Sequence, residues 1–228
     1  MKNILILLSA IVWFGCQKNE TNKIEVQISG ELRAIMHQGK MQANIGLDTV
    51  TLDNLVGLGA YENLNGELLV INEKVFHSFV QNDSLIVASN KKAKATLFVS
   101  AKVQAWDTIE VAGDDVTQLV YQHASKAGLK EPFPFQLIGT MELVDYHVIN
   151  FDPENGDIAN HKEGALKGQL TGERVTILGF YSTQAKGIYT HHDSDVHMHV
   201  INEDQSIMGH VDGLEPGEGM FNLLLPRL

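Results

Sequence analysis

From residue 133 to the C-terminus the chain is a succession of short apolar segments separated by turn residues, and this pattern restricts the fold more than any other feature. Such segments are typical of β-strands, and frequent turn residues between them are typical of antiparallel sheets. Turns are expected at 152–156 and at 170–173. We predict seven strands in this region, at Phe135–Glu142, Tyr146–Phe151, Gly164–Leu170, Val175–Tyr181, Val196–Ile201, Ile207–Val211 and Phe221–Leu225.

The N-terminal half contains a second group of strand-like segments. Ile24–Ser29 alternates apolar and polar residues, and Ala95–Val103 is rich in β-branched and aromatic residues, so both are predicted to be strands. Glu67–Ile71 and Lys74–His77 are predicted to form a hairpin that turns at Asn72-Glu73. Two short helical segments are also expected, at Glu31–His37 and at Asp53–Val56.

The clearest helix of the chain is predicted at Val116–Ala127, between the two groups of strands. Asp114 or Asp115 can cap its N-terminus, and Gly128 can end it in a left-handed conformation. His123 lies on the apolar stripe of this helix and is interpreted as a packed or half-exposed residue rather than a ligand. The pattern predicts an α+β fold with two sheet-rich halves of mixed or antiparallel strands and one main helix.

The first sixteen residues have the pattern of an export signal. Lys2 supplies a short positive region, Ile4–Phe14 an apolar region too short for a confident membrane span, and Gly15-Cys16 the end of the segment. A small residue before the only cysteine favours a lipoprotein signal, in which Cys16 is acylated and becomes the mature N-terminus. A plain secretory signal or an uncleaved anchor is the alternative interpretation.

The chain therefore divides into a signal peptide (1–16), a polar tether (17–23) and one folded domain (24–228). We expect an exported protein of the periplasm or cell envelope. The formal charge of −11 argues against nucleic acid as a partner and against docking on anionic lipid, so membrane association would come only from a lipid on Cys16. Exposed sheet edges would permit a homodimer.

Histidines are concentrated near the C-terminus, where five of the ten lie between positions 191 and 210. If 196–201 is a strand, His197 and His199 project from one face and Met198 and Val200 from the other. Together with His210 they could supply three imidazoles, a common donor set for a catalytic zinc ion with an open coordination position. Other divalent first-row metals also suit imidazole ligands. The alternative is that these histidines are simply exposed on a strand near a loop.

Two further histidines, His191 and His192, precede Asp193-Ser194-Asp195 in a predicted turn. They could be outer partners of the metal site or solvent-exposed residues of the turn, and the sequence leaves both interpretations open.

Motifs around the histidines resemble the α-acetolactate decarboxylase family, in which an H-x-H pair and a later G-H-V bind zinc. In the N-terminal half, residues 57–68 are similar to the glycine-rich turn of that family, which leads to a D/N-G-E motif whose glutamate is Glu67 here. The resemblance covers nearly the whole mature chain in order. The motifs that carry it near the C-terminus are Gly179-Phe180-Tyr181-Ser182-Thr183, Gly187-Ile188, His197-Met198-His199 and Gly209-His210-Val211.

The resemblance implies a fold, a reaction and a set of site residues. His197, His199 and His210 would bind zinc, and Glu67 would be the nearby carboxylate that handles protons. The reaction would be the zinc-dependent decarboxylation of 2-acetolactate, or of a closely related 2-hydroxy-3-keto acid, to acetoin and carbon dioxide. No organic cofactor would be needed, because the metal would stabilise the negative charge that develops on the substrate.

The chain departs from the family pattern at two places. An arginine that binds the substrate carboxylate in the family corresponds to Gln136, which can donate only neutral hydrogen bonds. The last strand, Asn222–Leu225, offers no carboxylate where family members often carry a further glutamate. Two other functions therefore remain open: an exported metal- or ligand-binding lipoprotein that retains the zinc site without decarboxylase activity, and a structural lipoprotein.

Overall fold

The computed structural model describes residues 23–160 and 163–228. The predicted signal peptide, Cys16 and all but the last residue of the predicted tether lie outside the described residues. Within the described part, no helix is both long enough and apolar enough to cross a membrane.

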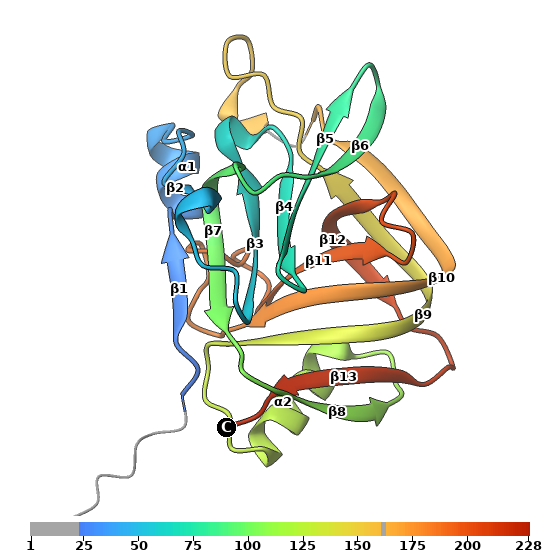
Figure 1. Cartoon of the computed structure of the whole chain (residues 1–228). Coiled ribbons are helices and arrows are strands. Elements are labelled where there is room, and N and C mark those ends of the chain that lie inside the picture. Colours follow the sequence, from blue (N-terminus) through green and yellow to red (C-terminus); the bar gives the residue numbers. More distant parts are fainter. Residues whose placement is uncertain (1–22, 161–162) are drawn as a thin grey trace, which may run out of the picture.

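The N-terminal half forms a seven-stranded antiparallel sheet in the order β1-β7-β3-β4-β5-β6, with β2 paired to β7 (Figure 1). The predicted hairpin is confirmed as β4 and β5, and both turn residues, Asn72 and Glu73, have positive φ, as a tight hairpin turn requires. The strands are β1 (Val26–Ser29), β2 (Ile45–Gly46), β3 (Leu55–Tyr61), β4 (Glu67–Ile71), β5 (Lys74–Gln81), β6 (Ser84–Ser89) and β7 (Lys94–Lys102).

The second sheet has six antiparallel strands and closes on itself. β10 pairs with both β9 and β11, and β12 pairs with both β11 and β9, so these four strands form a closed ring. β13 and β8 extend the ring from the N-terminal half of β9. The strands are β8 (Trp106–Val111), β9 (Phe133–Val148), β10 (Leu166–Tyr181), β11 (Val196–Asn202), β12 (Met208–Glu215) and β13 (Phe221–Pro226).

Two α-helices accompany the sheets, which confirms the predicted α+β class. In α2 (Val116–Lys126) the side chain of Asp115 accepts a hydrogen bond from the backbone N–H of Gln118 at 2.9 Å, and Gly128 follows the helix with φ of 75°. The shorter helix α1 (Leu32–Gln38) lies beside the first sheet (Figure 1). Three 3₁₀ turns occur at η1 (Leu47–Thr49), η2 (Glu62–Leu64) and η3 (Ile158–Asn160).

The prediction of separate short strands between residues 133 and 181 was wrong. Four predicted strands are halves of two 16-residue strands, β9 and β10, which pair over their full length in one register. The expected turn at 170–173 lies within β10, where Gly172 has positive φ. This glycine marks a local departure within a long strand instead of a chain reversal, because the pairing with β9 continues on both sides of it.

The expectations for residues 53–59 were also wrong, because the segment from Leu55 onward is strand β3 and not a helical or glycine-rich turn. The glycines are needed for close approach to the neighbouring strand β7. A Cβ on Gly57 would lie 2.4 Å from the ring of Phe98, and one on Gly59 would lie 1.9 Å from the carbonyl oxygen of Leu97.

Substituting Gly59 by alanine is therefore expected to destabilise the protein by about 3 kcal/mol, because the added methyl group meets backbone that cannot rotate away. The free energy of unfolding can be measured by denaturant titration. Gly219→Ala is the matched control, since a Cβ there has no neighbour within 4 Å. Equal stability of the Gly59→Ala variant and the unsubstituted protein would contradict this close approach.

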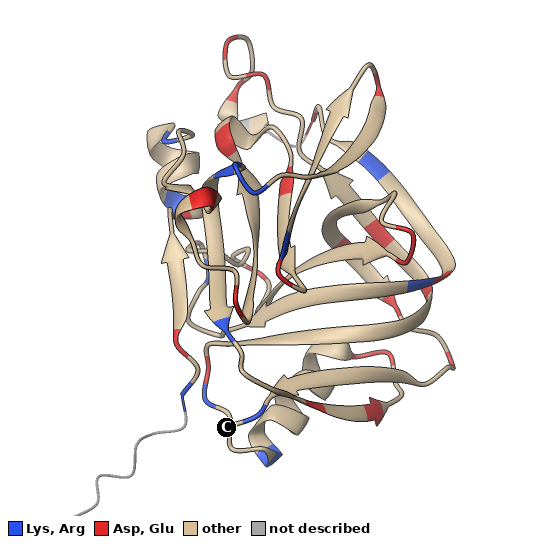
Figure 2. Ribbon diagram, in the orientation of Figure 1, with Lys and Arg blue, Asp and Glu red and all other residues tan. Residues whose placement is uncertain are grey.

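The buried apolar residues form two main cores. One lies inside the closed ring and beneath α2, and includes Phe135, Ile177 and Val200. The other lies between the two sheets, where Leu69 of β4 packs in the same cluster as Leu178 of β10. Charged residues lie mostly in loops and near strand ends (Figure 2), and among the described aspartate, glutamate, lysine and arginine residues only Glu67 is buried.

Candidate metal centre

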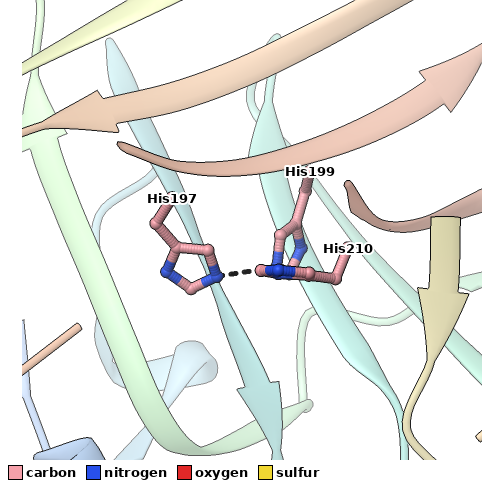
Figure 3. A group of neighbouring side chains, drawn as sticks. All are labelled: His197, His199 and His210. Atoms are coloured by element: carbon pink, nitrogen blue, oxygen red, sulfur yellow. Dashed lines mark hydrogen bonds between the residues drawn. The ribbon is translucent and has the colours of Figure 1, made fainter. Parts of the chain in front are cut away.

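Three of the predicted site residues converge between the two sheets. His197 and His199 project from β11 and His210 from β12, and the register pairs His199 directly with His210. All three side chains are buried, and each offers a nitrogen so placed that the three atoms lie within 4.8 Å of one another. Figure 3 shows the rings turned toward a common point, with Nε2 of His197 and Nε2 of His199 3.2 Å apart.

The two faces of β11 are divided as the sequence predicts. Val200 and Met198 belong to the core inside the ring, with Val200 fully buried and Met198 partly so. His197 and His199 are paired across to Phe180 and Leu178 of β10, which belong to the core between the sheets. The interpretation of these histidines as residues exposed at the surface is therefore wrong.

Glu67 reaches the same point from the opposite sheet. It begins β4 on the face that also carries Leu69 and Ile71, and only 2% of the residue is exposed. Its Oε2 lies 3.6 Å from Nε2 of His199, and its Oε1 accepts a hydrogen bond from the backbone N–H of Ile149 at 3.2 Å. The structure thus brings Glu67 together with the histidines.

The turn before Glu67 depends on a glycine. Gly66 has φ of 122°, and a Cβ at this position would lie 2.1 Å from the carbonyl oxygen of Ser78 on β5. Only glycine can adopt this backbone conformation so close to another strand. The N-G-E sequence is therefore a geometric requirement for aiming the carboxylate between the sheets.

Burial keeps the three imidazoles neutral. Desolvation, followed by the interaction with His147, lowers the pKa of His199 to about 3. Desolvation also lowers the pKa of His197 and of His210 well below the ordinary value, and the neighbouring histidines lower both further. A neutral imidazole is the form that binds a metal ion.

The donor set fits a zinc ion. Two nitrogens at the usual Zn–N distance in a tetrahedral arrangement are about 3.3 Å apart, close to the 3.2 Å between His197 and His199. Three histidines leave a coordination position for substrate, as catalytic zinc sites do. The described residues include no cysteine, so a thiolate-rich structural site is not available from them.

These pKa values predict how the stability of the metal-free protein depends on pH. Below the ordinary pKa of 6.5, histidines of the unfolded chain take up protons while the buried ones stay neutral, down to about pH 3 for His199. The free energy of unfolding should therefore decrease as the pH is lowered below 6.5, by about 1 kcal/mol per pH unit for each such histidine.

Denaturant titrations at pH 7 and pH 5 measure this fall. A variant with glutamine at positions 197, 199 and 210 should show a much smaller difference, the remainder including His77, whose pKa burial also lowers. Equal stability of the unsubstituted protein at the two pH values would contradict the buried, neutral cluster.

A cavity adjoins the cluster and is lined by residues of two kinds. The polar ones, which we call the polar wall, are Glu67, His147, His191, His197 and His210. No lysine or arginine is among the described residues that line the cavity. The others, which we call the apolar wall, are mostly apolar and come from α1, from the first sheet and from loops: Leu32, Ile35, Met36, Ala60, Leu64, Leu97, Ile149 and Tyr189.

The structure does not bring Gln136, the predicted counterpart of the family arginine, together with this group. Leu178 of β10 is paired with His199 of β11 on one side and with Gln136 of β9 on the other. Two strand spacings, about 10 Å, therefore separate the backbones of Gln136 and His199. The side chain of Gln136 borders a different cavity, which Trp106 and Asn72 also line.

The two histidines of the predicted turn have different positions. His191 lines the cavity, and its ring lies 5.6 Å from the ring of His210, centre to centre. His192 is exposed and is not among the residues that line the cavity.

The residue that sequence reasoning missed is His147. It is buried in β9, paired with His210 of β12, and its Nδ1 lies 2.7 Å from Oδ2 of Asp212. A single histidine in an apolar strand gives no sign of a site. The pairing of β9 with β12 is needed to find it, and that pairing joins segments far apart in the sequence.

Comparisons with known proteins identify a family and a shared fold. The family model described as "Alpha-acetolactate decarboxylase" matches residues 28–223. A Staphylococcus aureus protein of unknown function, described as similar to alpha-acetolactate decarboxylase, has a TM-score of 0.72 at 15% identity, over 91% of this chain and 86% of that one. No curated protein matches the chain.

Two solved structures of decarboxylases share the fold. Alpha-acetolactate decarboxylase from Bacillus subtilis strain 168 has a TM-score of 0.71 at 15% identity, and acetolactate decarboxylase from Bacillus subtilis subspecies spizizenii has 0.68 at 16%. Each match covers 89% of this chain and 86% of the other.

Proposed function

Because this chain belongs to the alpha-acetolactate decarboxylase family, we propose that it is a zinc-dependent enzyme that converts 2-acetolactate, or a closely related 2-hydroxy-3-keto acid, to acetoin or its analogue and carbon dioxide. One observation carries the proposal. Glu67 from one sheet and three neutral imidazoles from the other meet beside a cavity with an apolar wall.

His197, His199 and His210 would hold the metal through their ring nitrogens. A bound divalent cation would supply positive charge to oxygen atoms of the substrate where negative charge develops as carbon dioxide leaves. The lowered pKa values keep the three ligands available at neutral pH.

Glu67 is placed to move a proton. Its Oε1 is held by the backbone N–H of Ile149, which leaves Oε2 on the side of His199. In this position the carboxyl group would deliver a proton to the carbon that has lost carbon dioxide, a general acid role that requires a fixed donor.

The apolar wall suits the methyl groups of such a substrate. Ile35, Leu64 and Ile149 would pack against them and exclude water. Water exclusion strengthens the electrostatic interactions of the polar wall with the reacting oxygens.

The direct test uses the soluble chain without residues 1–16, analysed for bound metal and assayed for acetoin from racemic acetolactate. About one equivalent of zinc with acetoin formation supports the proposal.

One equivalent of metal without acetoin would favour the second candidate, an exported metal- or ligand-binding protein. The absence of lysine and arginine among the described residues lining the cavity favours this candidate, since no cationic side chain is placed there to bind a carboxylate. No metal after zinc loading would exclude both.

We also propose that the protein is exported and lipid-anchored through Cys16 in the cell envelope. Replacing Cys16 by serine in the full chain should move the protein from the membrane fraction to the soluble fraction when the expressing cells are fractionated. Gln17→Ser is the matched control. An unchanged membrane fraction for Cys16→Ser would contradict acylation at this residue.

A further inference from the structure

A histidine–carboxylate pair stands beside the metal centre and has no part in the roles proposed above. His147 is 2% exposed and lines the cavity, and its ring centre is 4.8 Å from that of His210. Its Nδ1 lies 2.7 Å from Oδ2 of Asp212, whose side chain is 39% exposed. The pair thus runs from the edge of the protein to the wall of the cavity.

A β-bulge brings Asp212 to this position. β12 pairs with β9 at Val211 and again at Gly213, and the register shifts between them, so Asp212 is the extra residue of a bulge. Bulges re-aim a side chain and are frequent next to active sites. Here the extra residue, Asp212, places its carboxylate against the ring of His147.

The contact determines which nitrogen of a neutral His147 carries the proton. A carboxylate oxygen only accepts hydrogen bonds, so Nδ1–H donates to Asp212 and Nε2 keeps its lone pair. Within the cavity His147 is then a hydrogen-bond acceptor. It complements a ligand that presents a donor, such as a hydroxyl group.

We propose that His147, oriented by Asp212, determines specificity by accepting a hydrogen bond from the 2-hydroxyl group of the substrate. The inference rests on the proposed function and names the group that recognises its 2-hydroxy acid. Asp212 is a positioning residue that acts through His147. The alternative group of metal ligands, His147, His210 and Asp212, is disfavoured, because the 2.7 Å between Nδ1 of His147 and Oδ2 of Asp212 is a hydrogen-bond distance and is shorter than the about 3.3 Å expected between two ligand atoms of a tetrahedral zinc ion.

The first test determines the tautomer of His147 and does not require the protein to be catalytically active. Two-bond ¹H–¹⁵N correlation spectra of the zinc-loaded full chain, assigned with the His147→Leu variant and recorded where the ring is neutral, should show the single ring proton of His147 on Nδ1. Asp212→Asn should lose this pure tautomer, because an amide both donates and accepts. Protonation on Nε2 in the unsubstituted protein, or two equivalents of bound zinc, would overturn the proposal.

The second test measures binding of two stable analogues, 2,3-dihydroxy-2-methylbutanoate and 3-hydroxy-2-methylbutanoate, which differ only by the 2-hydroxyl group. His147→Leu should reduce the preference for the first analogue about tenfold, the usual upper effect of one neutral hydrogen bond, and Asp212→Asn should reduce it less. Asp145→Asn is the matched control, since Asp145 lies opposite the same bulge but bonds to Gln169.

An equal loss of affinity for both analogues would overturn the proposal, because it would indicate binding of the shared carboxylate or a structural effect. An unchanged preference in both variants would also overturn it. Because neither experiment requires turnover, a protein that binds the hydroxy analogue through His147 but forms no acetoin would contradict the proposed function and leave this inference intact.

Discussion

Replacing His199 by alanine is expected to lower the affinity of the protein for zinc by at least about 100-fold and to abolish acetoin formation. Of the three candidate ligands this one is fully buried, and it is also central. Its Nε2 is 3.2 Å from His197 and 3.6 Å from Glu67, and its backbone is paired with His210. Removing it leaves two imidazoles on different strands, which is too few for a catalytic zinc site.

Metal content of the purified variant and competition with a zinc chelator measure this effect. His192→Ala is the matched control, because His192 belongs to the same histidine-rich segment but is exposed and away from the cavity. Circular dichroism of the metal-free proteins separates loss of a ligand from loss of the fold. A folded His199→Ala variant with unchanged zinc affinity would show that the metal binds elsewhere.

Local sequence patterns were sufficient for the histidine pair and for the fold class. The two-residue period of a strand placed His197 and His199 on one face and Val200 on the other, and the structure confirms both faces. Capping residues around α2 were equally local signals. Such predictions succeed because the physical cause lies within a few residues of its effect.

The role of Glu67 could not be predicted from the local sequence pattern. As a charged residue at the start of a strand it is unremarkable, and only the resemblance to a family indicated a role. Its burial depends on packing of the first sheet over the second, which no local period encodes. The backbone requirement at Gly66 is visible only once β5 lies beside the turn.

The ring of strands explains the errors. Because β9 bends and pairs with β13 in its first half and with β12 in its second, positions along one strand face different neighbours. Gln136 belongs to the first half and lies at another cavity, whereas His147 belongs to the second half and lies at the metal centre. Sequence reasoning treated these halves as separate strands and could not place either residue.

Replacing Glu67 by glutamine is expected to lower kcat by about 100- to 10,000-fold while the protein retains its metal, because the amide keeps the size of the side chain but cannot deliver a carboxyl proton. The backbone N–H of Ile149 can still donate to the amide oxygen, so the side chain should keep its place between the sheets. Acetoin formation and zinc content, measured on the same preparation, separate the two effects. Glu62→Gln is the matched control, since Glu62 has the same side chain but contacts Lys94 and does not line the cavity. A Glu67→Gln variant that keeps its metal and full activity would assign the proton to another group of the polar wall, whereas loss of the metal would make Glu67 a support of the centre instead of a proton donor.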